Sequence, residues 1–285
     1  MRLVTYRSND GPRAGVLTGG AVVDAWSTLG EPKRCGLREL IAAALTGDLR
    51  DALEDGTTTG TPLPLADIEL LPPIPDPEKI VCIGLNYRNH AAEAGIEAPE
   101  RPTIFGKFRN ALAAPGASVR LPAASRKVDY EAEVAFVVGR RSSQVSEDEA
   151  LDHIVGYTLL NDLSARDLQF ATPQWMSGKV FDGSAPCGPA LVTADEAGPH
   201  DAIEIALRLN GEEMQAASTS DLIFSMPRLL SHLSELMTLE PGDIVSTGTP
   251  AGVGGAREPH VWLRDGDEIE IDSPTLGTLR TRIAG

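Results

Sequence analysis

The chain has 285 residues, 42% of them hydrophobic and 23% charged, which allows one large domain or a main domain with a smaller one. Its formal net charge of −16 argues against a nucleic-acid surface, which needs clustered lysine and arginine, and against binding to anionic membranes. Cys35, Cys82 and Cys187 lack CxxC spacing, and there is neither a signal segment nor an apolar run long enough to span a membrane. We therefore expect a cytoplasmic protein without disulfide bonds.

Residues 1–72 predict a small α+β domain. Short strands are expected at Arg2–Tyr6, Arg13–Leu17 and Ala21–Ala25. One or two helices are expected within Gly36–Leu53, where leucine and isoleucine recur at helical spacing. The proline-rich stretch Leu71–Glu78 cannot continue a helix or a central strand, so we place a boundary there and a second domain over residues 73–285.

The second domain opens with an apolar strand, Lys79–Leu85, and a short helix, Tyr87–Ala94, for which Asn86 is a candidate N-cap. His90 and Glu93 lie three residues apart and share one face of this helix. An exposed helix pair with a small effect on stability is the ordinary explanation of an HxxE pattern. The alternative is a histidine general base polarised by a carboxylate, which the position after a buried strand favours.

The stretch Val128–Gly139, VDYEAEVAFVVG, carries three acids at alternate positions. Read as one strand, it has an apolar face and a face that begins acidic, with Asp129, Glu131 and Glu133, and ends apolar. Such a strand is expected to be covered on both sides. Buried acids without partners would each cost several kcal/mol, and a divalent metal removes that cost. A solvated strand end, with the acids facing water, is the alternative.

Further polar residues follow in the next segments. Asp162 ends the expected strand Gly156–Leu160 and is the natural third carboxylate, with a turn cap as the alternative. A short helix capped by Ser164 is expected to carry Arg166 and Gln169 on one face.

The irregular segment Trp175–Pro189 contains Lys179 and is either the wall of a site or a connector. Downstream, Asn210-Gly211 predicts a hairpin, and Ser225–Leu236 predicts an amphipathic helix with its four leucines facing inward. In the glycine-rich loop that follows, Thr247 or Thr249 is expected to donate a hydroxyl hydrogen bond to a small ligand. The remaining strands are expected at Val261–Leu263, Glu268–Ile271 and Gly277–Ile283.

Five motifs resemble, in order, those of the fumarylacetoacetate hydrolase family: GLNYRNHAAE, VDYEAEVAFVVG, NDLSARDLQ, GKVFDGSAPCGP and TGTPAGVG. The similarity runs from Lys79 to the C-terminus, and residues 1–72 are similar to the extra domain of many bacterial members. The resemblance implies an α+β, predominantly β fold, in which strands form a roll or sandwich around a metal site. It also implies a homodimer.

The resemblance assigns roles to individual residues. It implies that Mg²⁺, or Mn²⁺ or Ca²⁺, binds to Glu131, Glu133 and Asp162, all oxygen ligands suited to hard cations. It implies catalytic roles for His90, Glu93 and Lys179, and substrate contacts from Arg166, Gln169, Thr249 and Lys107. Asp129 matches no ligand position of the family. Lys107 stands in FGKF where many relatives have FLKP, which alters the surroundings of the substrate.

The implied substrate is a small anionic 2-oxo acid. Metal-assisted hydrolysis of a C–C bond in an acylpyruvate or β-diketo acid is our first expectation, because His90 and Glu93 are both present to activate water. Decarboxylation of oxaloacetate and isomerisation of a 2-hydroxydienedioate are alternatives, because each passes through an enolate stabilised in the same way. A non-catalytic keto-acid binding protein is a weaker alternative, since binding alone does not need a base.

Overall fold

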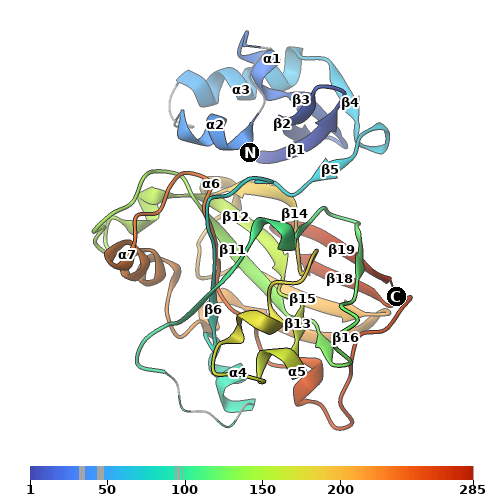
Figure 1. The fold of residues 1–285 in the computed structure, drawn as a ribbon. Helices are drawn as coiled ribbons and strands as arrows, with labels where there is room; N and C mark the ends of the chain where they lie inside the picture. Colours follow the sequence, from blue (N-terminus) through green and yellow to red (C-terminus); the bar gives the residue numbers. More distant parts are fainter. Residues whose placement is uncertain (32–35, 44–47, 94, 96, 98, 285) are drawn as a thin grey trace.

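The computed structural model describes residues 1–31, 36–43, 48–93, 95, 97 and 99–284. It has a small N-terminal unit above a larger body of two facing sheets, and helices α4 and α5 lie on the side of the body away from that unit (Figure 1). None of the helices in the described part of the chain is long and apolar enough to span a membrane. Cys82 and Cys187 are free and buried, and Cys35 lies outside the described residues.

The N-terminal unit is an antiparallel sheet covered by helices. Its elements are β1 (Arg2–Ser8), β2 (Gly11–Thr18), β3 (Ala21–Asp24), α1 (Ala25–Thr28), α2 (Leu37–Ala42), α3 (Asp48–Thr59) and β4 (Pro62–Pro64). The three strands expected from the sequence are confirmed, and the helical region holds both α2 and α3.

The N-terminal sheet continues into the larger of the two body sheets, in the order β4-β3-β2-β1-β14-β12-β11-β17-β6-β7. The body strands on this path are β6 (Ile80–Gly84), β7 (Thr103–Lys107), β11 (Ala132–Val138), β12 (Ile154–Asn161), β14 (Ala185–Thr193) and β17 (Ile244–Ser246). Two short strands pair off this path, β5 (Leu70–Leu71) with β1 and β8 (Leu112–Ala113) with β14.

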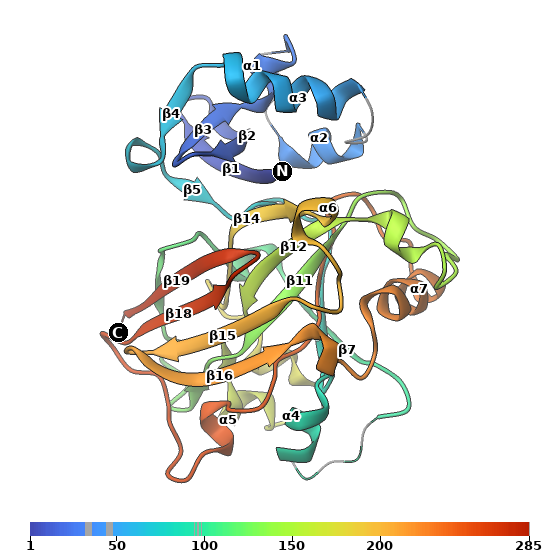
Figure 2. The same cartoon turned by 180° about the vertical axis from the view of Figure 1, so that it is seen from behind.

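A second sheet of five strands faces the first (Figure 2). Its order is β16 (Glu212–Ser218), β15 (Glu204–Leu209), β18 (Glu268–Ser273), β19 (Gly277–Ala284) and β9 (Ser118–Arg120). The body helices are α4 (Arg88–Glu93), α5 (Arg166–Gln169), α6 (Ala194–Ala197) and α7 (Met226–Leu236). Short 3-10 turns lie at Leu65–Asp67, Arg109–Ala111, Ala150–His153, Trp175–Gly178, Thr219–Asp221 and Gly254–Ala256. The expected strand-rich roll is confirmed.

Strand β11 is buried on both faces, as its sequence predicts. Val134 and Phe136 belong to the core between the two sheets. Ala135 and Val137 point the other way, into a second core that also contains Leu3 of the N-terminal unit. The N-terminal unit and the body therefore share an apolar core as well as a sheet.

Several expectations need correction. Val128–Gly139 is two strands rather than one, because β10 (Val128–Asp129) pairs with β13 (Ser164–Ala165) and β11 belongs to the large sheet. At the break, three consecutive peptide N–H groups donate to side-chain oxygens instead of to a neighbouring strand, which ends the ladder. The bonds run from Tyr130 N to Asp129 Oδ1, from Glu131 N to Asn161 Oδ1 and from Ala132 N to Gln215 Oε1, at 2.9–3.1 Å.

Three smaller corrections concern local structure. Ser164 does not cap α5, because its hydroxyl donates to the Asp162 carbonyl. Leu236 is 59% exposed at the last turn of α7, rather than facing inward. Val261–Leu263 forms no strand.

Candidate active site

A pocket of about 570 Å³ opens on the side of the body that carries α4 and α5. Of the residues proposed from the sequence, it is lined by His90, Glu93, Glu131, Glu133, Arg166, Gln169, Lys179 and Thr249. These residues come from five separate segments, which the two sheets bring to one place. Asp162 lies directly behind the floor, and Lys107 does not line the pocket.

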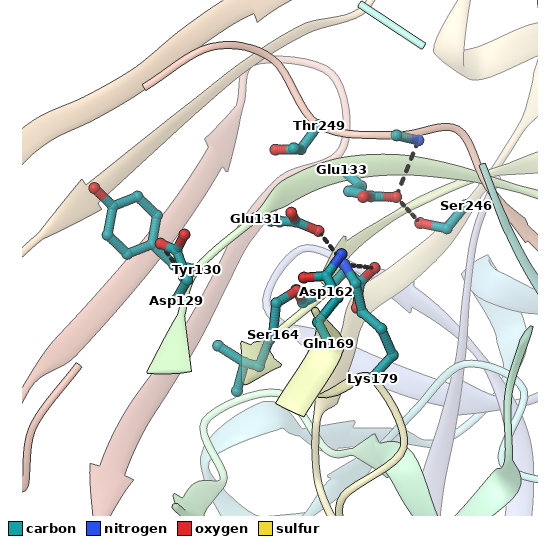
Figure 3. A network of polar contacts seen from close by, with 12 residues as sticks. Asp129, Tyr130, Glu131, Glu133, Asp162, Ser164, Gln169, Lys179, Ser246 and Thr249 are labelled. Atoms are coloured by element: carbon teal, nitrogen blue, oxygen red, sulfur yellow. Dashed lines mark hydrogen bonds and ion pairs between the residues drawn. The ribbon is translucent and has the colours of Figure 1, made fainter. Parts of the chain in front are cut away.

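Glu131 and Glu133 at the pocket floor form a buried cluster with Asp162 behind it, and one carboxylate oxygen of each lies within 4.8 Å of the others (Figure 3). Glu133 is on β11, Glu131 is at the break between β10 and β11, and Asp162 directly follows β12. The strand break is what allows this arrangement, because Glu131 leaves the ladder and its peptide N–H is held by Asn161 beside Asp162.

Two buried cations balance part of this charge. The Lys179 ammonium donates to Glu131 Oε2 at 2.6 Å and to Asp162 Oδ2 at 2.8 Å (Figure 3). The Arg166 guanidinium lies 2.7 Å from Glu131 Oε1. Burial raises the pKa of Glu131, but the positive charges of Arg166 and Lys179 outweigh it and hold that pKa below its usual value. Burial lowers the pKa of Lys179, and the Asp162 and Glu131 carboxylates outweigh it and raise that pKa.

Glu133 is in a different electrostatic environment from Glu131. Its Oε2 accepts from Ser246 Oγ at 2.5 Å and from Gly248 N at 3.0 Å. Burial, together with the negative charges of Asp162 and Glu131, raises its pKa well above the usual range. Gly248 has φ +98°, a conformation that strains any residue with a Cβ, so glycine is needed here for the loop to bring its N–H to Glu133.

The structure places Lys107 behind the acid cluster rather than against a substrate. Its ammonium donates to the carbonyl oxygens of Leu163, Ser184 and Lys179 and lies 2.8 Å from Asp162 Oδ1. The expected substrate contact of Lys107 therefore needs revision: in this geometry Lys107 supports Asp162 and the segment after it. The altered FGKF motif contributes Phe105, which lines the pocket, and Phe108, which is 55% exposed.

His90 and Glu93 form the expected pair at the pocket wall. His90 Nδ1 lies 3.2 Å from Glu93 Oε2, and Glu93 Oε1 accepts from Gly252 N at 2.9 Å. Both carboxylate oxygens of Glu93 are thus engaged, which leaves His90 Nε2 as the nitrogen open to a substrate. Glu93 also ties α4 to the glycine-rich loop 247–255.

Gln169 and Thr249 line the pocket, but both have partners inside the protein. Gln169 Oε1 accepts from Arg166 Nη1 at 3.0 Å, so the two residues share a face of α5 as expected. The Thr249 hydroxyl donates to the Ala132 carbonyl, and the Thr247 hydroxyl donates to the Val134 carbonyl. Neither threonine directs its hydroxyl proton at the pocket, which differs from our expectation, because the loop binds β11 through these groups.

Asp129 has a structural role that the sequence did not reveal. Its carboxylate accepts from Gly254 N at 2.7 Å and Gly255 N at 3.0 Å, and from Arg166 Nε at 2.9 Å. It therefore joins the glycine-rich loop to the arginine that contacts Glu131. The DxE spacing of Asp129 and Glu131 is visible in the sequence, but it does not predict that Asp129 binds the distant glycines Gly254 and Gly255.

Asn86 is not the N-cap of α4. Its side chain is fully buried and bonds three backbone groups instead: it accepts from Phe224 N and donates to Phe224 O and Thr247 O, at 2.8–3.1 Å. Three segments that are distant in sequence meet at this residue. Asn86 therefore fixes the loop that delivers Gly248 to Glu133.

The acid cluster fits a hard divalent cation. All three ligand groups offer oxygen, and Asp162 Oδ1 is a buried atom with no hydrogen-bond partner among the described residues, although the Lys107 ammonium is near. Three carboxylates within reach of one ion are the donor set that a hard cation takes.

Comparison with known proteins now identifies the family. A model described as the fumarylacetoacetate (FAA) hydrolase C-terminal region matches residues 79–284. The chain belongs to the fumarylacetoacetate hydrolase family. A second model, described as Rv2993c-like N-terminal, matches residues 1–73. The expected family is thereby confirmed, and the chain is an enzyme of this family that acts on small keto acids.

Individual relatives carry more specific names. A mitochondrial oxaloacetate tautomerase of Xenopus laevis is 39% identical over 98% of this chain and 89% of its own. The oxaloacetate tautomerase YisK of Bacillus subtilis is 44% identical over 77% of this chain and 74% of its own. A solved maleylpyruvate hydrolase of Sphingobium, in complex with manganese(II) and pyruvate, is 30% identical with a TM-score of 0.83, over 100% of this chain and 99% of that one.

Proposed function

We propose that this fumarylacetoacetate hydrolase family enzyme interconverts the keto and enol forms of oxaloacetate or of a closely similar 2-oxo acid. The observation that carries the proposal is the placement of the His90–Glu93 pair at the wall of the pocket whose floor is the acid cluster. A proton carrier and a site that stabilises negative charge thus face the same small molecule.

Each of the pocket side chains has its own role in this reaction. His90 Nε2 removes the proton from C3 of the keto form and returns it in the reverse direction, while Glu93 holds the ring through Nδ1. Arg166 and Lys179 supply fixed positive charge to an anionic substrate. Because Glu93 is bonded to Gly252, the pair keeps its position relative to the loop that covers the floor.

Glu131, Glu133 and Asp162 would hold the divalent cation, Mg²⁺ or Mn²⁺. When bound, such a cation acts as a Lewis acid on the 2-oxo group. The manganese in the Sphingobium hydrolase supports this assignment.

Tautomerisation is favoured over the C–C hydrolysis expected from the sequence. It needs proton transfer only, whereas hydrolysis also needs a positioned water and cleavage of a bond. The names of the two curated relatives favour the isomerase alternative. Hydrolysis of an acylpyruvate remains the second candidate, because a maleylpyruvate hydrolase shares the fold over its whole length.

The test is to mix enzyme with enol oxaloacetate and follow the loss of enol absorbance, with pyruvate formation and acylpyruvate cleavage measured in parallel. We expect rapid ketonisation that a chelator abolishes. The variant His90→Ala should be slower by about 100-fold or more, as for the loss of a general base. Accumulation of pyruvate without ketonisation would instead establish a decarboxylase, and cleavage of the acylpyruvate alone would establish the hydrolase.

The chain offers a matched control. His232 and Glu235 on α7 repeat the HxxE spacing, with His232 Nδ1 and Glu235 Oε2 4.0 Å apart, and they do not line the pocket. His232→Ala should therefore leave the rate within twofold of the unmodified enzyme. Equal losses in His90→Ala and His232→Ala would contradict the proton-transfer role.

A further inference from the structure

The mouth of the pocket differs chemically from its floor. The floor residues Glu131, Glu133 and Lys179 are at most 5% exposed. Nearer the solvent the lining is aromatic: Phe105, Trp175 and Trp262 are partly buried, and Phe170 and His260 are exposed. Phe170 is 67% exposed directly after α5 and adds apolar surface at the mouth.

Trp175 is held in place by the backbone beneath it. A Cβ on Gly84, at the end of β6, would lie 2.3 Å from Trp175 Cζ3, so the indole rests directly on the glycine. The indole also meets Phe105 edge-on, with ring centroids 5.8 Å apart. Phe105 in turn lies under the Lys179 ammonium, 4.9 Å from its centroid, so this aromatic wall begins at the charged floor.

Trp262 likewise packs against a glycine, in another segment of the chain. A Cβ on Gly255 would lie 3.2 Å from Trp262 Cη2, and Gly255 N donates to Asp129 Oδ2. His260 lies against Trp262 with ring centroids 5.4 Å apart. The two tryptophans are thus positioned by glycines in two separate segments, and both line one pocket.

The pocket is also larger than the substrate proposed above needs. A volume of about 570 Å³ falls in the range of pockets that enclose drug-sized ligands, and a four-carbon dicarboxylic acid fills only a small part of it. A ligand held at the floor by a carboxylate and a 2-oxo group would extend any C3 substituent toward the aromatic mouth. Planar apolar rings pack well against such side chains.

We propose that the aromatic mouth binds the ring of an arylpyruvate, so that the enzyme also interconverts the keto and enol forms of 2-oxo acids with an aryl group on C3. The inference rests on the proposed tautomerase function for its chemistry. The C3–H bond breaks, its electron pair forms the C2–C3 double bond, and the 2-oxo oxygen takes up a proton; the reverse returns the proton to C3. No further reactant is needed.

The activity test compares phenylpyruvate with oxaloacetate. Trp175→Ala and Trp262→Ala should each lower the ratio of kcat/KM for phenylpyruvate to that for oxaloacetate by about tenfold, through loss of ring packing. Trp175→Phe should restore most of the ratio if packing is the cause. Leu236→Ala, an exposed apolar side chain outside the pocket, should leave the ratio unchanged. A ratio that moves less than twofold in both tryptophan variants would overturn the proposal.

A binding measurement separates this inference from the proposed function. 3-Phenyllactate and malate are 2-hydroxy acids that do not tautomerise, so titration calorimetry reports their binding alone. The enzyme with Mn²⁺ should bind 3-phenyllactate about tenfold more tightly than malate, and Trp175→Ala should remove the difference. This result without any tautomerisation would reject the proposed function and keep the aryl site. Equal binding of the two acids would reject the aryl site.

Discussion

Lys179 decides the charge balance of the pocket floor. Its ammonium bridges Glu131 and Asp162, and without it three buried carboxylates would face one another with Arg166 and Lys107 as the nearby cations. Removing one partner of a buried ion pair is costly because the other charge stays buried and unpaired. This residue therefore contributes to the stability of the metal-free protein as well as to the site.

We expect Lys179→Met to lower the free energy of unfolding in the presence of chelator by about 3 kcal/mol. Added Mn²⁺ should recover more stability in this variant than in the unmodified protein, because the cation then supplies the missing charge. Chemical denaturation with and without Mn²⁺ measures both effects. Lys127→Met serves as the control, since Lys127 is an exposed lysine of the same pocket. Equal denaturation midpoints for the two variants in chelator would contradict the bridging role.

At the scale of elements, the site depends on loops held by side chains rather than by strand ladders. Asn86 joins the end of β6, the segment before α7 and the glycine-rich loop. Asp129 joins that loop to α5. The positions of these helices and loops around the pocket are therefore set by a few polar side-chain contacts.

The variant Asn86→Ala should lose about 3 kcal/mol of stability, because three buried backbone groups lose their partner. Asn89→Ala is a suitable comparison: its Oδ1 accepts from Ala251 N at 3.3 Å in an exposed position, and we expect a loss of about 0.5 kcal/mol. Urea denaturation of both variants gives the values. The Asn86 assignment fails if the two losses are the same.

The sequence predicted most of the strands, the hairpin and the three acids, because alternating apolar residues, the Asn-Gly turn and acids at a strand or its end are local signals. It did not predict the break after Asp129, because the acceptors that end the ladder, Asn161 and Gln215, are 30 and 83 residues away from their donors. The position of Lys107 outside the pocket could not be predicted from the sequence for the same reason. Its partners Leu163 and Ser184 become neighbours only when β7 and the segment after β12 meet.

At the scale of the whole molecule, the N-terminal unit contributes strands to the larger sheet and side chains to the core behind β11. β1 pairs with β14, and Leu3 packs in the same core as Ala135 and Val137 of β11. Part of the core that covers the far side of β11 thus comes from the first segment of the chain. A homodimer remains an expectation from the family resemblance.

Deletion of residues 1–72 should therefore yield a body that aggregates or melts at a much lower temperature, because it exposes an apolar sheet face and the edge of β14. Size-exclusion chromatography and thermal denaturation test this. Arg50→Ala removes the Arg50–Asp195 ion pair between the two units and the Arg50–Glu54 pair within α3, both partly exposed, and should change the melting temperature little. A monodisperse truncated body with the original melting temperature would show that the shared core is dispensable.

The bridging ammonium of Lys179 also bears on how the enzyme matures. Proteins whose metal ligands have no internal counter-charge often cannot fold until the ion arrives, so their assembly depends on metal supply. Here a lysine from the chain itself already lies between two of the three carboxylates. We therefore expect folding and metal loading to be separate events, with the polypeptide reaching its final shape before any cation binds.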